Sequence, residues 1–570
     1  MRRCCVLAAS FLILARVSVV AGAEPGVSVD GNKLTVRTAT VEAVFNGMAV
    51  VSLTSADGKV QFVGPEPPAH GVDLFYLNGN NLGQDKHQRV SVREISALAA
   101  RIVVEGDDSH RSLLVAVDPD THDVRVTPDG LSSRRGLRSV GWRVPFAAES
   151  TVILPVVNGM QLKPHQPWPG NGRFLWPYQW CAQLAVVERD GESLMVHCED
   201  TQMRFKAVRV TRNGPKTELC FESEPTGPLW DNRTAGGIEW RINAYKGDWK
   251  VPATRYRDWL YKTYDLAEKR KHRPAWVDKI TLAVCWADAG SEAFLDALAE
   301  VHPPEETLIH LSGNWRNDKY DVNYPDYTPN DKGLGYMAKA RKMGFHVMPH
   351  FNYFAIWMKH PFFQEVRDFQ IRSVDLNSPE GWYWPPQTYD YTRMAYIHPG
   401  LGLWRDKLVD VLLETCGKME TDAAFIDQTL CTWNTDNGQV QGMNTIEGMW
   451  QMQEEFAAVR PGLVLAGEGL NEISFQRQCF AQAHIPDGWG DLEAKHPQGV
   501  HPIGSFLWAG HTRLIGYHHL NPDNKDFDLG VEVYERMDAL PTIVSGNPKH
   551  LKEMSAGTKK IFERAKKKGS

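Results

Sequence analysis

Two short apolar runs in the C-terminal half of the chain each end in a carboxylate. The first covers residues 423–427 and ends at Asp427; the second covers residues 463–468 and ends at Glu468. Each run is too short for a helix and is bounded by turn-forming residues, so each predicts a fully buried strand of a parallel sheet. A helical segment separates them. A strand-helix-strand unit with an acid at each carboxyl end is how a (β/α) barrel presents reactive side chains.

The pattern around these runs alternates between strand and helix. Predicted strands lie at 280–286, 307–311, 345–351, 423–427, 463–468 and 503–508, with 542–544 as a candidate for a later strand. Predicted helices lie at 291–301, 333–343, 404–419 and 446–459. Regular alternation of this kind predicts a (β/α)8 TIM barrel over residues 276–570.

The N-terminal half has a different periodicity. Residues 24–246 consist of short runs with period-two alternation, separated by Gly, Asp, Asn and Pro. This pattern predicts an antiparallel β-sandwich with one solvated face, larger than an immunoglobulin domain. Residues 247–275 change character, and 253–260 form an amphipathic helical segment. We expect 247–275 to be a linker helix between the two parts.

The first 23 residues have the features of a signal peptide. Arg2 and Arg3 precede an apolar stretch at 4–15, and residues 21–23 read Ala-Gly-Ala, an A-x-A cleavage site. The mature chain is expected to start near Glu24 and to be exported to the periplasm or the extracellular space. No later segment is apolar enough to span a bilayer, so we expect no stable membrane insertion after cleavage.

Charge and cysteine content narrow the classes of function. The net charge of −6 is spread along the chain and no basic patch stands out, which argues against nucleic acid as a partner. Seven cysteines follow the predicted cleavage site, at spacings that match no zinc or redox motif. A Cys181–Cys198 disulfide is an open alternative to free thiols. The late histidines and the acidic loop at 321–331 match no metal template, so we predict no metal and no cofactor.

Polar and aromatic residues follow the predicted strands at the end where barrel sites form. The candidates for contact with a ligand are Trp286, Asp288, Asn314, Trp315, His350, Asn352, Gln428 and Trp508. Nineteen tryptophans is a high number, and several lie in loops, where indoles can stack on the C–H faces of sugar rings. Large aromatics also fill cores, so each tryptophan has a structural alternative. Together these residues predict a carbohydrate substrate, an oligo- or polysaccharide.

The two acids suit cleavage of a glycosidic bond, which needs a proton donor and a group that stabilises the oxocarbenium-like centre. Asp427, short and held at a strand end, is the expected nucleophile. Glu468 is the expected acid/base because its longer side chain can reach the glycosidic oxygen. Neighbouring strands could hold the carboxyl groups about 5–5.5 Å apart, which implies retention of configuration. Alternatively, a strand-end acid can cap a helix or pair with an arginine. Glu472 is a rival to Glu468.

Several segments resemble a known architecture. Residues 32–36, 45–47 and 51–53 (NKLTV, FNG and VSL) resemble the first strands of galactose-mutarotase-like sandwiches that precede glycosidase barrels, and 247–249 with 256–259 (GDW and YRDW) resemble the linker of such proteins. The barrel is similar to a bacterial hydrolase-like family and, more remotely, to endo-α-N-acetylgalactosaminidases and the α-amylase-like clan. The resemblance implies an Asp nucleophile on strand 4 and a Glu acid/base on strand 5, which map onto Asp427 and Glu468.

The sequence therefore predicts an exported glycoside hydrolase that cleaves an α-linked glycan by a retaining two-carboxylate mechanism. A non-catalytic carbohydrate-binding protein on the same scaffold is one alternative. A polysaccharide lyase or epimerase is another. That chemistry would need a Tyr, His or Lys base beside a cation, and Arg316 is the cation near the predicted site.

Overall fold

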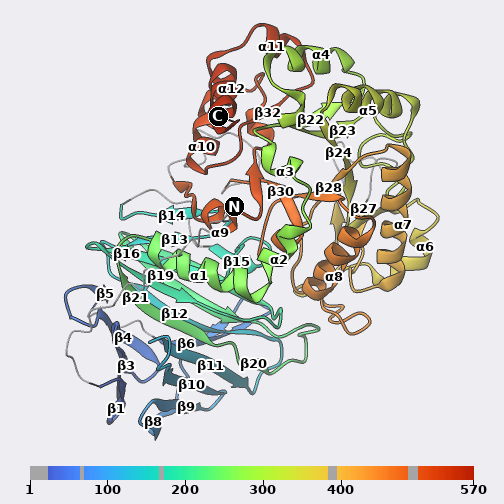
Figure 1. The fold of residues 1–570 in the computed structure, drawn as a ribbon. Helices are drawn as coiled ribbons and strands as arrows, with labels where there is room; N and C mark the ends of the chain where they lie inside the picture. Colours follow the sequence, from blue (N-terminus) through green and yellow to red (C-terminus); the bar gives the residue numbers. More distant parts are fainter. Residues whose placement is uncertain (1–23, 65–69, 166–171, 383–393, 486–498, 570) are drawn as a thin grey trace, which may run out of the picture.

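The computed structural model describes residues 24–64, 70–165, 172–382, 394–485 and 499–569. The predicted signal peptide, residues 1–23, lies outside these ranges. The described chain forms a β-rich N-terminal half and a parallel barrel with helices around it (Figure 1). The predicted fold class is confirmed.

The N-terminal half is built from antiparallel sheets. One sheet follows chain order and contains β1 (Gly26–Asp30), β2 (Lys33–Arg37), β3 (Val41–Asn46), β4 (Ala49–Ser55) and β5 (Gln61–Val63). A second has the order β15 (Gly172–Trp176), β18 (Lys206–Asn213), β19 (Lys216–Ser223), β12 (Leu137–Phe146), β6 (Val72–Tyr76) and β7 (Asn81–Leu82). The largest has the order β14 (Met160–Leu162), β13 (Thr151–Leu154), β16 (Leu184–Arg189), β17 (Glu192–His197), β21 (Trp240–Lys246), β11 (Val124–Ser132), β10 (Ser109–Val117), β9 (Ala99–Gly106) and β8 (Gln88–Ser96), with β20 (Thr234–Gly236) beside β11.

Period-two burial explains these strands. In β10 every second side chain is buried, and the strand pairs with β9 on one side and β11 on the other. The inward faces meet around large aromatics, including Trp180 and Trp240, whose rings stack with centroids 6.1 Å apart. Burial of such residues supplies much of the apolar area that stabilises a sandwich.

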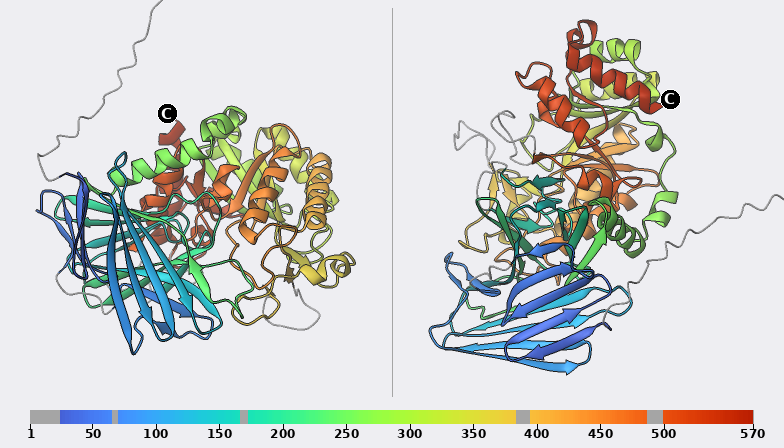
Figure 2. Two further views of the ribbon diagram at one scale, coloured as in Figure 1. Left: turned by 90° about the horizontal axis from the view of Figure 1, so that it is seen from below. Right: turned by 90° about the vertical axis from the view of Figure 1, so that its left-hand side faces the viewer.

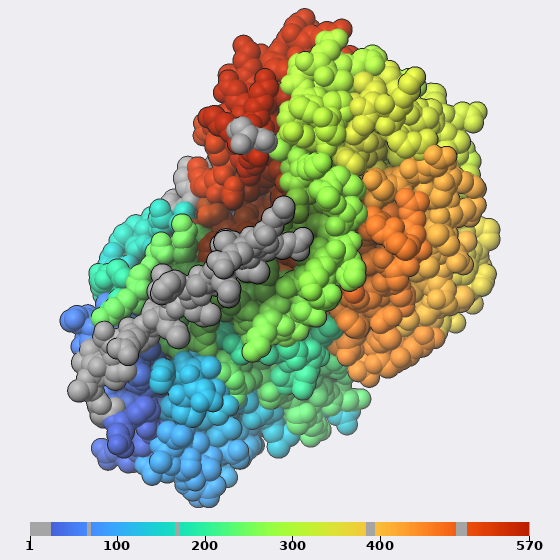
Figure 3. All heavy atoms as spheres, viewed as in Figure 1, coloured from blue at the N-terminus to red at the C-terminus, as the bar shows by residue number. Residues whose placement is uncertain are grey.

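Helices connect the two halves. α1 (Lys250–Thr263) is followed by α2 (Leu266–Lys271) and α3 (Trp276–Lys279). These green elements lie along the boundary between the β-rich half and the barrel (Figure 3). α1 buries Ala253, Tyr256 and Leu260, which share one helical face.

The barrel strands are parallel and close on themselves. In chain order they are β22 (Leu282–Asp288), β23 (Thr307–Gly313), β24 (His346–Asn352), β28 (Ala423–Asp427), β29 (Val464–Glu468), β30 (Gln478–Gln482), β31 (Arg513–Ile515) and β32 (Thr542–Val544). From β22 to β31 each strand pairs with the next in chain order, and β32 pairs with β22, which leaves β31 and β32 facing each other in a nearly closed barrel. An isolated parallel bridge between Ile515 and Leu540 links the end of β31 to the segment before β32.

The helices of the barrel half lie mainly outside the strands (Figure 2). They are α4 (Glu292–Val301), α5 (Asp331–Met343), α6 (Phe363–Val366), α7 (Gly402–Lys418), α8 (Thr445–Ala458), α9 (Ile503–Trp508), α10 (Phe527–Arg536), α11 (Lys549–Lys552) and α12 (Ala556–Gly569). α8 begins with a capping box, in which Asn444 accepts from the Glu447 amide and Glu447 accepts from the Asn444 amide. No helix of the described residues has the length and apolar character needed to cross a membrane.

An insertion follows β24. It contains a small antiparallel sheet with the order β25 (Ala355–Trp357), β27 (Met394–Tyr396) and β26 (Gly381–Trp382). This sheet places Tyr396 and Trp382 in ring contact, with centroids 5.3 Å apart.

One predicted strand is wrong. Residues 503–508 form helix α9, and the sixth barrel strand is β30 instead. The burial pattern gives the reason. Ile503, Gly504, Leu507 and Trp508 are buried while the two residues between them are partly exposed, which is helical spacing and not period two. β30 was missed because glutamines at both ends hide its short apolar centre.

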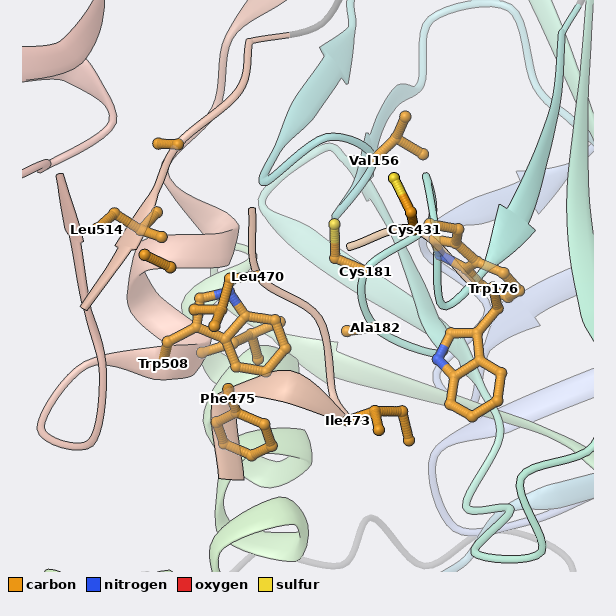
Figure 4. Packing of buried hydrophobic residues seen from close by; sticks show 14 of the residues in the cluster. Val156, Trp176, Cys181, Ala182, Cys431, Leu470, Ile473, Phe475, Trp508 and Leu514 are labelled. Atoms are coloured by element: carbon orange, nitrogen blue, oxygen red, sulfur yellow. The ribbon is translucent and has the colours of Figure 1, made fainter. Parts of the chain in front are cut away.

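The two halves share a packed junction. On the barrel side, Trp508 packs on Phe475 with ring centroids 4.8 Å apart. Trp176 and Cys181 of the β-rich half lie across from them (Figure 4). The described cysteines are free thiols, so the alternative of a Cys181–Cys198 disulfide is not realised.

Candidate active site

Asp427 and Glu468 come together at the carboxyl end of the barrel. Each is the last residue of its strand, and β28 and β29 pair in parallel. Each acid shifts the pKa of the other, so the two carboxyl groups lie within electrostatic reach of each other. Asp427 retains 8% of its surface and Glu468 retains 9%. The two carboxyl groups therefore meet at the barrel mouth, nearly out of solvent.

The two acids differ in the donors they receive. The Tyr517 hydroxyl donates to Glu468 Oε1 at 2.7 Å, and the Gln428 amide donates to Glu468 Oε2 at 3.2 Å. His484 Nε2 lies 3.3 Å from Glu468 Oε1. Among the described residues, Asp427 accepts one side-chain hydrogen bond, from Asn352 Nδ2 to Oδ2 at 2.9 Å, and His350 lies farther away. Negative charge is therefore better supported on Glu468 than on Asp427.

The pKa values follow this asymmetry. Burial, together with the Glu468 charge, raises the pKa of Asp427 well above its ordinary value. Burial also opposes ionisation of Glu468, but the neighbouring His484 imidazole and the hydrogen bond from Tyr517 outweigh it and lower the pKa. The two acids titrate as a pair, and the proton is favoured on Asp427 over Glu468.

A line of imidazoles leads from the barrel interior to Asp427. Gln482 Nε2 lies 3.4 Å from His310 Nδ1, and His310 Nε2 lies 3.0 Å from His350 Nδ1. His350 Nε2 then lies 3.7 Å from Asp427 Oδ2. If Gln482 donates, His310 and His350 each carry their proton on Nε2, and the last N–H faces the acid. Burial lowers the pKa of His310 to about 3 and that of His350 well below its ordinary value, so both rings are neutral.

Aromatic rings surround this end of the barrel. Trp286 is partly exposed and lies 6.3 Å from His350, 5.8 Å from Tyr320 and 6.2 Å from Tyr517, measured between ring centroids. Its backbone has φ of 60°, an uncommon value for a non-glycine residue. Trp286, His350, Asn352 and Gln428, all predicted from the sequence, therefore lie at one site.

Asp288 and Asn314 form a pair at the ends of neighbouring strands. Asn314 Nδ2 donates to Asp288 Oδ2 at 2.6 Å, and the Gly290 amide donates to Asp288 Oδ1 at 2.7 Å. Asn314 is exposed and Asp288 is partly exposed. The pair lies after β22 and β23, on the strand-end face predicted for it.

Two predicted ligand residues are not brought to the carboxyl pair. Trp315 is 1% exposed, and its ring packs beside Tyr327 and Phe351. Trp508 is fully buried in α9 at the junction. Both indoles fill cores, the structural alternative for large aromatics.

Arg316 is not available as a cation for lyase chemistry. Its Nη1 donates to the carbonyls of Val322 and Asp326 at 3.0 and 2.9 Å, and its guanidinium lies over the rings of Tyr324 and Tyr327. These contacts hold the loop that follows β23.

Glu472, the rival acid, has a structural position. It is fully buried, and its carboxyl group accepts from Trp176 Nε1 at 3.0 Å, from Gln183 Nε2 at 2.8 Å and from the Tyr256 hydroxyl. These partners belong to the β-rich half and to α1. Glu472 therefore ties the barrel to the rest of the chain and does not face the carboxyl pair.

Sequence reasoning missed His484 and Tyr517. His484 follows the end of β30 by two residues, and Tyr517 follows the end of β31 by two residues. Their positions match the strand-end rule that identified the other candidates. Recognition of these two strands would have identified both residues. Tyr320 and Tyr396 lie in insertions, where strand counting gives no signal.

The described residues hold no cluster of three or more His, Cys, Asp or Glu side chains arranged to bind a metal ion.

The architecture is that of glycoside hydrolases that carry a β-rich region before a parallel barrel. The profile of a family described as "Domain of unknown function (DUF6259)" matches residues 238–472, which include Asp427 and Glu468. A Bacteroides thetaiotaomicron protein, whose name assigns it provisionally to the glycoside hydrolases, is 20% identical over 272 residues. The match covers 46% of this chain and 40% of that protein, so the chain spans less than half of this curated relative.

Solved structures show the same fold. The ligand-free α-N-acetylgalactosaminidase NagBb from Bifidobacterium bifidum has a TM-score of 0.69 at 13% identity, covering 94% of this chain and 92% of that one. Its complex with GalNAc gives 0.62 at 14% identity, covering 86% and 83%. The GH36 α-galactosidase AgaB from Geobacillus stearothermophilus gives 0.50 at 9% identity, covering 95% and 86%. The resemblance to glycoside hydrolases predicted from the sequence is confirmed at the level of the fold.

Proposed function

We propose that this protein hydrolyses an α-linked glycoside with net retention of configuration, using Asp427 as the nucleophile and Glu468 as the acid/base. The observation that carries the proposal is that two buried carboxyl groups, each of which shifts the pKa of the other, end adjacent parallel strands. Retaining enzymes hold their carboxyl groups about 5–5.5 Å apart, whereas inverting enzymes leave about 6.5–9.5 Å for a water molecule. Two acids that end paired strands and shift each other's pKa fit the closer arrangement.

The similar proteins support the class of substrate. NagBb is an α-N-acetylgalactosaminidase with a GalNAc complex, and AgaB is an α-galactosidase. An α-linked galactose-type sugar is therefore the first substrate to test here. The partly exposed Trp286 and the polar pair Asp288 and Asn314 offer one apolar face and several hydrogen-bonding groups, which sugar recognition requires.

The reaction has two steps. The Asp427 carboxylate attacks the anomeric carbon and the glycosidic C–O bond breaks, while Glu468 gives its proton to the leaving oxygen. Water then attacks the same carbon, Glu468 takes a proton from it, and Asp427 leaves as a carboxylate. These roles need the proton on Glu468, whereas without substrate the proton is favoured on Asp427. Positive charge developing at the anomeric carbon would lower the pKa of Asp427 and so favour the proton on Glu468.

The test is a panel of nitrophenyl glycosides that includes α-galactoside and α-N-acetylgalactosaminide, with the first-formed anomer identified by NMR. We expect an α-anomer product, and Asp427→Asn and Glu468→Gln should each reduce kcat by ~10²-fold or more. Asp422→Asn is the matched control because Asp422 directly precedes β28, at the end of the strand opposite to Asp427. Full activity in either active-site variant would refute the assignment.

Azide rescue separates the two roles. With azide, a Glu468→Ala variant should form the α-glycosyl azide, because azide attacks a covalent β-linked intermediate. An Asp427→Gly variant should form the β-glycosyl azide, because azide then replaces the nucleophile. The reverse outcome would exchange the roles of the two acids.

We also propose that the protein is exported, with residues 1–23 as its signal peptide and a mature chain that starts at Glu24. The support is the charge and apolar pattern of the leader. N-terminal sequencing of the protein from the extracellular or periplasmic fraction tests this, and an intact Met1 would refute it.

A further inference from the structure

We propose that Tyr178, Trp433 and Tyr396 form a binding subsite for the sugar ring on the leaving-group side of the scissile bond, and that the β-rich half therefore contributes directly to substrate recognition. This inference rests on the proposed hydrolase function and adds a location and a ligand class to it: a pyranose ring that presents an apolar C–H face.

The three rings come from different parts of the chain. Tyr178 follows β15 of the β-rich half, Trp433 follows β28, and Tyr396 ends β27 of the insertion. The Trp433 centroid lies 5.3 Å from that of Tyr178 and 5.9 Å from that of Tyr396. All three residues are partly exposed, whereas Phe354, in ring contact with Trp433 and Tyr396, is fully buried. A cluster that only filled a core would bury its outer rings as well.

The cluster lies beside the carboxyl pair, next to Gln428, which contacts Glu468. Gln428 links them, since its Nε2 donates to the Tyr396 hydroxyl at 3.3 Å and its backbone amide donates to Glu468 Oε2 at 3.2 Å. Cys431, burial and the charge of Glu468 together raise the pKa of the Tyr178 phenol, so Tyr178 also lies within electrostatic reach of Glu468. The acid/base must face the leaving oxygen, so rings on its side face the leaving group.

Polar contacts fix the cluster. Trp433 Nε1 donates to Glu380 Oε2 at 2.7 Å. The next residue, Asn434, donates through Nδ2 to Glu224 Oε1 at 2.7 Å and accepts from the Gly227 amide at 3.0 Å. Both of these partners belong to the β-rich half. Burial raises the pKa of Glu380, and the hydrogen bond from the Trp433 indole partly offsets this effect. Residues of both halves thus hold the cluster in place, as a preorganised subsite requires.

Two substrates that differ in their leaving group test this subsite separately from the rest of the site. One leaving group contains a sugar ring and the other does not. The probes are an α-galactosyl disaccharide (melibiose) and α-galactosyl fluoride, or their N-acetylgalactosaminyl counterparts if the substrate panel selects that sugar. Fluoride has no ring to stack on Trp433. The variants are Trp433→Ala, Tyr178→Ala and Tyr178→Phe. Trp450→Ala is the matched control, because Trp450 is a partly exposed indole on the outer helix α8.

We expect Trp433→Ala and Tyr178→Ala to lower the ratio of kcat/KM on the disaccharide to kcat/KM on the fluoride at least tenfold. Tyr178→Phe should keep most of the ratio, and Trp450→Ala should keep all of it. Equal changes on both substrates, or no change, would overturn the subsite.

A binding measurement covers the case of no turnover. Calorimetric titration of Asp427→Asn with the disaccharide should show at least fivefold weaker binding when Trp433→Ala is added, with binding of the monosaccharide unchanged. If the wild-type protein hydrolyses no substrate but Trp433→Ala still weakens disaccharide binding, the proposed function is refuted and the subsite stands. Disaccharide binding that is absent, or unaffected by Trp433→Ala, would overturn the subsite.

Discussion

The Tyr256 hydroxyl in α1 donates a hydrogen bond to the carboxyl group of Glu472, just beyond the strand end that carries Glu468. The same carboxyl group also accepts from Gln183 and Trp176 of the β-rich half. Burial raises the pKa of Glu472 above its ordinary value, although each of these donors favours the charged form. The position of Glu468 is therefore tied to the junction between the two halves.

The first prediction concerns this junction. Glu472→Gln replaces one carboxylate oxygen with an NH₂ group, so at least one of the buried N–H donors of Trp176 and Gln183 loses its acceptor. We expect the free energy of unfolding to fall by about 3 kcal/mol, as measured by urea denaturation. Glu414→Gln, an exposed substitution on α7, should change it by less than ~0.5 kcal/mol. Equal stability of the two variants would mean that Glu472 does not hold the junction.

The second prediction concerns Asp427. Its folded pKa is raised, so the wild-type protein loses stability as the pH rises above the unfolded value of 3.8 and up to the folded pKa. Asp427→Asn has no ionisation and escapes this loss. We expect the variant to be inactive yet more stable at pH 7 by about 0.5–2 kcal/mol, with the gain disappearing near pH 4. A gain that is constant with pH would contradict the raised pKa.

The third prediction concerns His310. Its folded pKa is lowered to about 3, so protonation of the unfolded chain destabilises the protein as the pH falls below about 6.5. His310→Phe removes this term. Its measured cost in unfolding free energy should therefore be about 2 kcal/mol smaller at pH 5.0 than at pH 7.5. Equal costs at the two pH values would show that His310 titrates normally in the folded protein.

The fourth prediction separates packing from ligand binding at Trp508. Trp508→Ala should lower the free energy of unfolding by about 3–5 kcal/mol, because a buried indole leaves a cavity at the junction. The milder Trp508→Phe variant should leave KM within twofold of wild type, while Trp286→Phe should raise KM. A raised KM in Trp508→Phe with unchanged stability would restore the sequence-based assignment.

The sequence alone determined the strand ends that form the acid pair. Strands β28 and β29 are apolar runs with one charged residue each, and in a sheet covered on both faces such a residue has to lie at the strand end. The parallel order of neighbouring strands then predicts that Asp427 and Glu468 are side by side. His350, Asn352 and Gln428 follow from the same rule, because they end or follow neighbouring strands.

Only the tertiary structure decided the surroundings of that pair. β30 and β31 are short and bounded by polar residues, so their local sequence did not reveal them, and with them His484 and Tyr517 were missed. Trp315 and Trp508 are buried in cores. Their spacing in the sequence did not show this, because it does not distinguish an indole that stacks on a ligand from one that packs in a core. The donors around Glu468 come from segments far apart in the chain. The location of the shared proton depends on those distances, which no local pattern encodes.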